Sequence, residues 1–103
     1  MPVLAAESLQ LFYELDDRWG MCECLYDRAE TVLMLGNPEL AVCLSSVAAD
    51  LREELGMVSS DDQAARQQRV LEVARASLPA EAFWQSWADC WQMEIQDVLD
   101  LLL

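Results

Sequence analysis

The sequence predicts an all-α protein with about five helices arranged in antiparallel hairpins. Glycine and proline, the residues that most often end helices, occur only three times each in 103 residues. Apolar residues recur at intervals of three and four, as one face of a helix requires, and no stretch alternates in the manner of a strand. A hydrophobic fraction of 54% supplies enough material for the core of one small domain.

The first two predicted helices are separated by Asp16-Asp17. Residues 4–15 carry an apolar stripe with helical spacing that ends at these two acids. A second stripe runs over 19–35 and stops at Gly36, and glycine is typical of the position just after a helix. We therefore expect one helix on each side of the acidic pair.

The signals for a hairpin are strongest around Gly36. Asn37 suits the N-cap of the next helix and Pro38 its first turn, where the missing N–H of proline costs nothing. The helix over 38–55 then continues until Gly56. These local signals predict a tight turn between two antiparallel helices.

The second half of the chain is expected to form further helices. Ser60-Asp61-Asp62-Gln63 fits a capping box that starts a helix over 61–78. Pro79 ends that helix and suits the first turn of the next, over 79–91. Apolar residues in 95–102 predict a short terminal helix.

The domain organisation follows from these elements and from an internal repeat. We expect one helical-repeat domain over 1–103, with one and a half hairpins in 1–56 and capping helices in 57–103. A shift of 40 residues aligns apolar positions, and the aligned pairs are Leu4 with Leu44, Leu11 with Leu51 and Leu15 with Leu55. The first helix therefore resembles the second half of a hairpin, as if the chain began within a repeat.

Charge and cysteine content restrict the partners and the compartment. With 19 acidic residues against six arginines, the net charge of -13 repels nucleic acids and anionic membranes. No apolar run is long enough for a transmembrane helix. The N-terminus lacks the features of a signal peptide, so four reduced thiols and a cytoplasmic location are expected. The cysteines are Cys22, Cys24, Cys43 and Cys90.

Several short segments together resemble a known type of repeat. They include Asp17-Arg18-Trp19-Gly20, Gly36-Asn37-Pro38-Glu39, Leu51-Arg52-Glu53, Ala82-Phe83 and Trp87-Ala88. This pattern, which covers most of the chain, resembles the last tetratricopeptide-type repeat of large bacterial ATPase-containing regulators and the segment after it. These regulators include LuxR-type transcriptional regulators and related ATPase–cyclase proteins.

The resemblance implies an α-solenoid fragment that binds partners or senses a signal for neighbouring ATPase and DNA-binding domains. The chain has no GxxxxGK[ST] phosphate loop, so it would be the C-terminal scaffold of such a multidomain protein. Three polar residues occupy positions that are usually apolar in the family: Glu23, Arg28 and Thr31. Two interpretations are open for them: solvated surface residues paired with other charges, or candidates for contacts with a peptide in a groove of the repeat.

No residue pattern predicts an enzyme. The chain has no histidine and no lysine, and we find no nucleophile beside a base. Cys22 and Cys24 would point about 200° apart on a helix, so they cannot share a tetrahedral zinc and are expected to be structural thiols. The acidic pairs Asp16-Asp17, Glu53-Glu54 and Asp61-Asp62 are expected to be solvated or capping residues. We thus predict no catalytic residue, no metal and no cofactor.

The aromatic residues of the predicted helix over 79–91 allow two interpretations. Trp84, Trp87 and Trp91 follow the spacing of a core stripe. Three tryptophans on one short helix are nevertheless more than a small core needs, and tryptophan is frequent at binding hot spots. The candidate partner-binding residues are therefore Glu23, Arg28, Thr31, Trp84, Trp87 and Trp91.

The sequence as a whole favours protein–protein interaction, with partners that it does not identify. An alternative is a free-standing small protein that acts by self-association, and a third hypothesis is a small-molecule sensor with a pocket beneath the tryptophans. Because the first helix lacks a hairpin partner, we expect its apolar face to form a homodimer. The candidate self-association residues are Leu4, Leu11, Phe12 and Leu15.

Overall fold

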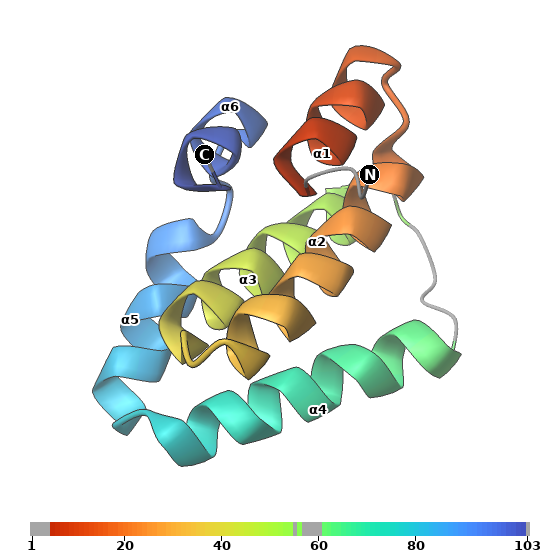
Figure 1. Ribbon diagram of the computed structural model, residues 1–103. Helices are drawn as coiled ribbons and strands as arrows, with labels where there is room; N and C mark the ends of the chain where they lie inside the picture. Colours follow the sequence, from red (N-terminus) through yellow and green to blue (C-terminus); the bar gives the residue numbers. More distant parts are fainter. Residues whose placement is uncertain (1–4, 55, 57–60, 103) are drawn as a thin grey trace.

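The computed structural model describes residues 5–54, 56 and 61–102, which form six α-helices (Figure 1). They are α1 (Ala5–Glu14), α2 (Arg18–Met34), α3 (Pro38–Glu54), α4 (Asp61–Ser77), α5 (Ala80–Cys90) and α6 (Ile95–Leu102). These residues include no strand, so the all-α prediction is confirmed. About five helices were expected, and the described residues form six, because the short helix predicted over 95–102 is present as an element of its own. None of the described helices is both long and apolar enough to cross a membrane.

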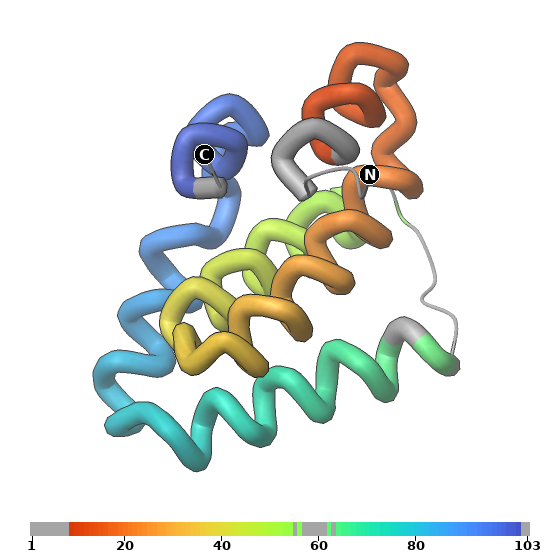
Figure 2. Tube along the Cα trace, viewed as in Figure 1, coloured from red at the N-terminus to blue at the C-terminus, as the bar shows by residue number. Residues whose placement is uncertain are grey.

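The antiparallel pair α2 and α3 forms the centre of the molecule, and the other helices pack around it (Figure 1). Helix α4 contacts both members of the pair, whereas α5 lies along α3. Helices α1 and α6 contact each other and lie above the central pair in the view of Figure 2, with α4 below it. The main core joins residues of all these helices, and a smaller apolar cluster lies where α3, α4 and α5 meet.

The turn between α2 and α3 confirms the predicted hairpin. Gly36 has a φ of +89°, in the left-handed region that glycine adopts without a steric penalty. The Oδ1 of Asn37 accepts a hydrogen bond from the backbone N–H of Leu40 at 3.2 Å, which caps α3. Ala29 and Ala41 are buried in the same core, where their small side chains favour close approach of the two helices.

Helix α1 is held from two sides, so part of the apolar face that was expected to be bare is covered within the chain. The ring of Phe12 lies so close to Gly20 that a Cβ there would be 2.5 Å from a ring carbon. Leu9 is fully buried in the core that also contains Val98 and Leu99 of α6. The C-terminal helix thus covers part of the surface that a second copy was expected to cover.

The outer side of α1 remains accessible. Leu11 is 53% exposed and Leu15 66% exposed, while Phe12 is half-buried against the core. The predicted repeat pairs Leu11 with Leu51, yet Leu51 is buried, because α3 is surrounded by other helices and α1 lies at the surface. The predicted residues Leu4, Leu55 and Ser60 lie outside the described part of the chain.

Candidate functional site

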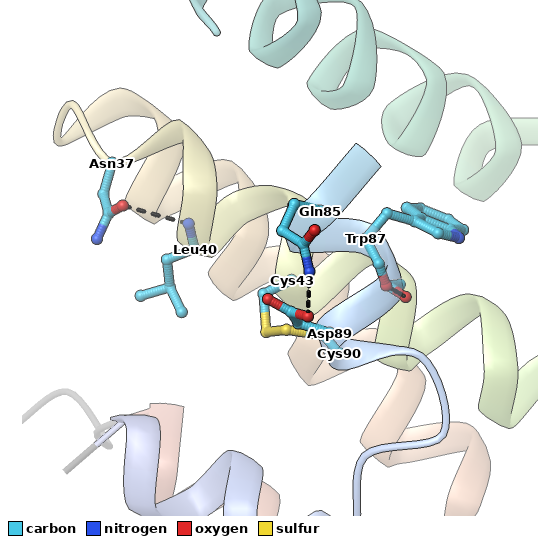
Figure 3. Close-up of a disulfide and its surroundings, with 8 residues drawn as sticks. Asn37, Leu40, Cys43, Gln85, Trp87, Asp89 and Cys90 are labelled. Atoms are coloured by element: carbon cyan, nitrogen blue, oxygen red, sulfur yellow. Dashed lines mark hydrogen bonds between the residues drawn. A yellow bond between two sulfur atoms is a disulfide. The ribbon is translucent and has the colours of Figure 1, made fainter. Parts of the chain in front are cut away.

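Helix α5 carries most of the predicted tryptophans, and three kinds of contact fix it to α3. Cys43 and Cys90 form a disulfide between the two helices (Figure 3). The hydroxyl of Ser46 donates a hydrogen bond to the backbone carbonyl of Trp87 at 2.8 Å. Phe83 is buried in the small cluster where α3, α4 and α5 meet. The surface of α5 is therefore presented on a firmly held helix.

The disulfide corrects the prediction that all four cysteines are reduced. Cys43 and Cys90 are 47 residues apart, and only the packing of α5 on α3 brings their Cα atoms to 5.2 Å, within the range of disulfides. Cys22 and Cys24 are free, and burial raises the pKa of the Cys22 thiol to about 11, so it stays protonated at neutral pH. The cysteines therefore no longer support the assignment to a reducing compartment.

The tryptophans of this region differ in exposure. Trp84 is 54% exposed, and its ring packs nearly perpendicular to the neighbouring ring of Phe83, with centroids 5.0 Å apart. Trp87 and Trp91 are half-buried and stack on each other at 6.1 Å. In Figure 3 the indole of Trp87 points away from the disulfide. Only Phe83 of these four rings is fully buried, so the aromatic stripe is core on one flank and surface on the other.

Arg75 of α4 contacts the exposed Trp84 and the neighbouring Phe83. Its guanidinium carbon lies 5.5 Å from the ring centre of Phe83 and 5.7 Å from that of Trp84. Such contacts between a cation and aromatic rings are attractive. Among the described residues, no carboxylate forms an ion pair with Arg75. The aromatic rings are therefore its main partners.

Arg75 also lines a cleft of about 400 Å³ between α3 and α4. The other lining residues include Arg52, Gln67, Gln68, Leu71 and Glu72. Nη1 of Arg52 donates hydrogen bonds to the hydroxyl of Tyr26 at 2.8 Å and to Oε1 of Gln67 at 3.2 Å. The Nε2 of Gln67 in turn donates to the backbone carbonyl of Ser45. The polar wall of the cleft is thus held in place by a hydrogen-bond network.

No family model, curated protein or solved structure matches this chain. The resemblance to the repeats of bacterial regulators therefore stays a prediction. The function has to be inferred from the exposure, contacts and charge of the residues around Trp84 and the α3–α4 cleft.

The other predicted partner-binding residues do not come together with the tryptophans. Glu23 lies on the side of α2 that faces α4, where it pairs with Arg66. Thr31 is exposed, and its hydroxyl donates to the backbone carbonyl of Asp27. Arg28 is half-buried, and its Nε has no hydrogen-bond partner among the described residues. None of these three positions of α2 lines one of the clefts of about 470, 400 or 370 Å³.

An ion-pair cluster between α2 and α4 was missed by the sequence analysis. The guanidinium of Arg66 pairs with Glu30, Asp27 and, more distantly, Glu23. The hydrogen bonds that Arg66 donates to Glu30 and Asp27 raise the pKa of Arg66 above its ordinary value. The three acids recur at intervals of four and three, so the sequence does show a charged stripe on α2. Its partner on α4 is visible only in the fold.

A second cleft, of about 470 Å³, is acidic and lies near the turns beside α1, α3 and α6. Its carboxylates include Asp16, Asp50, Glu54 and Glu94, and Arg18 pairs with Asp16 and Glu54. Burial, followed by repulsion from Glu54, raises the pKa of Asp50. Within the described residues, no group of cysteines and carboxylates is arranged to hold a metal ion.

A third cleft, of about 370 Å³, lies between α2 and α4 and includes the exposed Met34 and Val73. Arg69 is at its rim and makes no ion pair with a described carboxylate. None of these three clefts is lined by a described tryptophan. The hypothesis of a sensor pocket beneath the tryptophans thus finds no support in their geometry.

Proposed function

We propose that this chain is a non-enzymatic protein–protein interaction module and that the surface around Trp84 binds the partner. The observation that carries the proposal is that Trp84 is 54% exposed although Phe83 and Arg75 hold its ring on the surface. Burying the exposed part of a large aromatic ring is favourable by about 1–3 kcal/mol. Tryptophan is accordingly enriched among the residues that dominate binding energy.

The rigidity of α5 adds to this proposal. The disulfide at Cys90 and the hydrogen bond at Trp87 fix the helix that presents Trp84. A surface that is already ordered loses less conformational entropy when a partner binds. We therefore assign binding to the α4–α5 surface and not to the polar residues of α2.

The wider setting is proposed from the resemblance alone. It places the module at the C-terminal end of a cytoplasmic bacterial transcriptional regulator or ATPase, as a tetratricopeptide-like scaffold. The capped turn at Asn37 and the antiparallel α2–α3 pair are what such a repeat requires. The net charge of -13 supports a segment that contacts neither nucleic acid nor membrane.

Replacing Trp84 with alanine should weaken partner binding at least about thirtyfold, as loss of a hot-spot residue does. The probe is a set of peptides selected from a random phage-displayed library on the folded, disulfide-intact chain, with affinities measured by titration calorimetry. Trp19→Ala is the matched control, because Trp19 is 48% exposed on a different surface. Peptides that bind both variants equally well would contradict the assignment, and selection of no peptide would contradict the interaction function itself.

Self-association through α1 is a second candidate function, favoured by the exposure of Leu11 and Leu15. Salt screens the repulsion between two acidic copies beyond about 8 Å, whereas apolar burial persists. We expect a homodimer at micromolar concentration in sedimentation equilibrium, and Leu11→Asp should dissociate it. Met34→Asp, at the far end of α2 and 87% exposed, should leave the dimer intact. A single species of 11.7 kDa for the unmodified chain would exclude this candidate.

A further inference from the structure

We propose, on the basis of the interaction function above, that the α3–α4 cleft beside Trp84 takes an acidic segment of a protein partner. In this arrangement Arg75 binds a carboxylate of the partner while Leu71 and Trp84 contact a neighbouring apolar side chain. The exposure of Trp84 indicates that a partner binds, whereas the charge of Arg75 indicates the chemistry of that partner.

Arg75 contacts the described residues mainly through aromatic rings, since its guanidinium carbon lies 5.5 Å from the ring centre of Phe83 and 5.7 Å from that of Trp84. A guanidinium group carries its N–H donors in a planar fork that suits the two oxygens of a carboxylate. No described carboxylate occupies them. By contrast, Arg18 and Arg66 are each surrounded by acids of the chain itself.

Among the described residues that line the cleft, positive charge exceeds negative charge. These residues include the two arginines Arg52 and Arg75 and one acid, Glu72, although the chain as a whole carries -13. The acidic cleft near α1 has the opposite balance, with several carboxylates and one arginine. A partner that approaches the α3–α4 cleft therefore meets a surface complementary to an acid.

The cleft and its surroundings combine polar and apolar groups. Leu71 is half-buried in the cleft, and Trp84 is exposed just beyond Arg75. A volume of about 400 Å³ accommodates a few side chains and not a whole helix. A partner segment with an acid next to an apolar residue fits both features. A foreign partner is favoured as the occupant, because the homodimer expected above forms through α1, which lies on the opposite side of the central α2–α3 pair from α4.

The peptides selected on the folded chain provide the test. We expect them to be enriched in aspartate or glutamate beside an apolar residue. Arg75→Gln, which removes the charge of an exposed side chain, should weaken their binding about ten- to hundredfold, the value of a hydrogen bond to a charged group. Arg69→Gln is the matched control, since Arg69 is also exposed on α4 without an ion pair to a described residue, and should have little effect.

Charge reversal gives an independent readout. A library selected on Arg75→Glu should yield peptides rich in lysine or arginine in place of acids, and circular dichroism should confirm that this variant is folded. Two results would contradict the proposal of an acidic partner: peptides that require Trp84 but show no enrichment in acids, or peptides that bind Arg75→Gln as tightly as the parent chain. Neither result would contradict the interaction function. Selected peptides that match an acidic stretch of this chain would replace the foreign partner with a second copy and also overturn the proposal.

Discussion

Removing the disulfide between Cys43 and Cys90 should lower the free energy of unfolding by about 4 kcal/mol. The bond closes a loop spanning 47 residues, and the entropy that it removes from the unfolded chain corresponds to this amount. Small domains are stable by about 5–15 kcal/mol in total, so the effect is large. Urea denaturation of the Cys43→Ala/Cys90→Ala double variant, compared with the oxidised parent chain, measures it directly.

Two controls separate the bond from the side chains. In a reducing agent, the free energy of unfolding of the parent chain should fall by most of its difference from the double variant. The two thiols are still present under these conditions, but the covalent link is gone. Cys24→Ser should respond to the reducing agent just as the parent does, since Cys24 is a free thiol. Equal stability of the oxidised and reduced parent chain would contradict the stabilising role of the bond.

The disulfide could not be predicted from the sequence, whereas the α2–α3 hairpin could. The α2–α3 hairpin could be predicted because its signals are local: Gly36 adopts the left-handed conformation and Asn37 caps the next helix within a few residues. A bond between Cys43 and Cys90 depends on which faces of two distant helices meet. Helical spacing places each cysteine on its own helix but leaves the rotation of one helix against the other undetermined.

The same limit applies to α1. The sequence correctly assigned an apolar stripe to it, but gave no sign that α6 would pack against Leu9. Leu11 and Leu51, which the predicted repeat aligns, differ in burial for a physical reason. Burial depends on how many neighbours surround a helix, and α3 has neighbours on more sides than α1.

The candidate site was predicted only in part. Spacing placed Trp84, Trp87 and Trp91 on one flank of α5, and tryptophan chemistry suggested contact with a partner. The position of Phe83 at the junction of three helices decides which side of α5 faces inward, and this leaves Trp84 at the surface. Arg75 belongs to a different helix, so its contact with Trp84 could not be read from the sequence.

Replacing Phe83 with alanine should destabilise the fold by about 3–5 kcal/mol, the usual cost of removing a buried phenylalanine. Phe83 is only 3% exposed and packs with Val42 and Ala74, so the cavity would open where α3, α4 and α5 meet. The same change removes one of the two rings that contact Arg75 and the ring that packs perpendicular to Trp84. Urea denaturation measures the stability, and titration with the selected peptides measures the binding of whatever remains folded.

Phe83→Leu separates the two roles of this side chain. Leucine fills much of the space of the ring, so most of the stability lost in Phe83→Ala should return. It provides no aromatic face for Arg75, so peptide binding should stay weaker than in the parent chain. A loss of less than about 1 kcal/mol in Phe83→Ala would show that the junction is not a tightly packed core. Recovery of both stability and binding in Phe83→Leu would show instead that Trp84 and Arg75 keep their positions without an aromatic support.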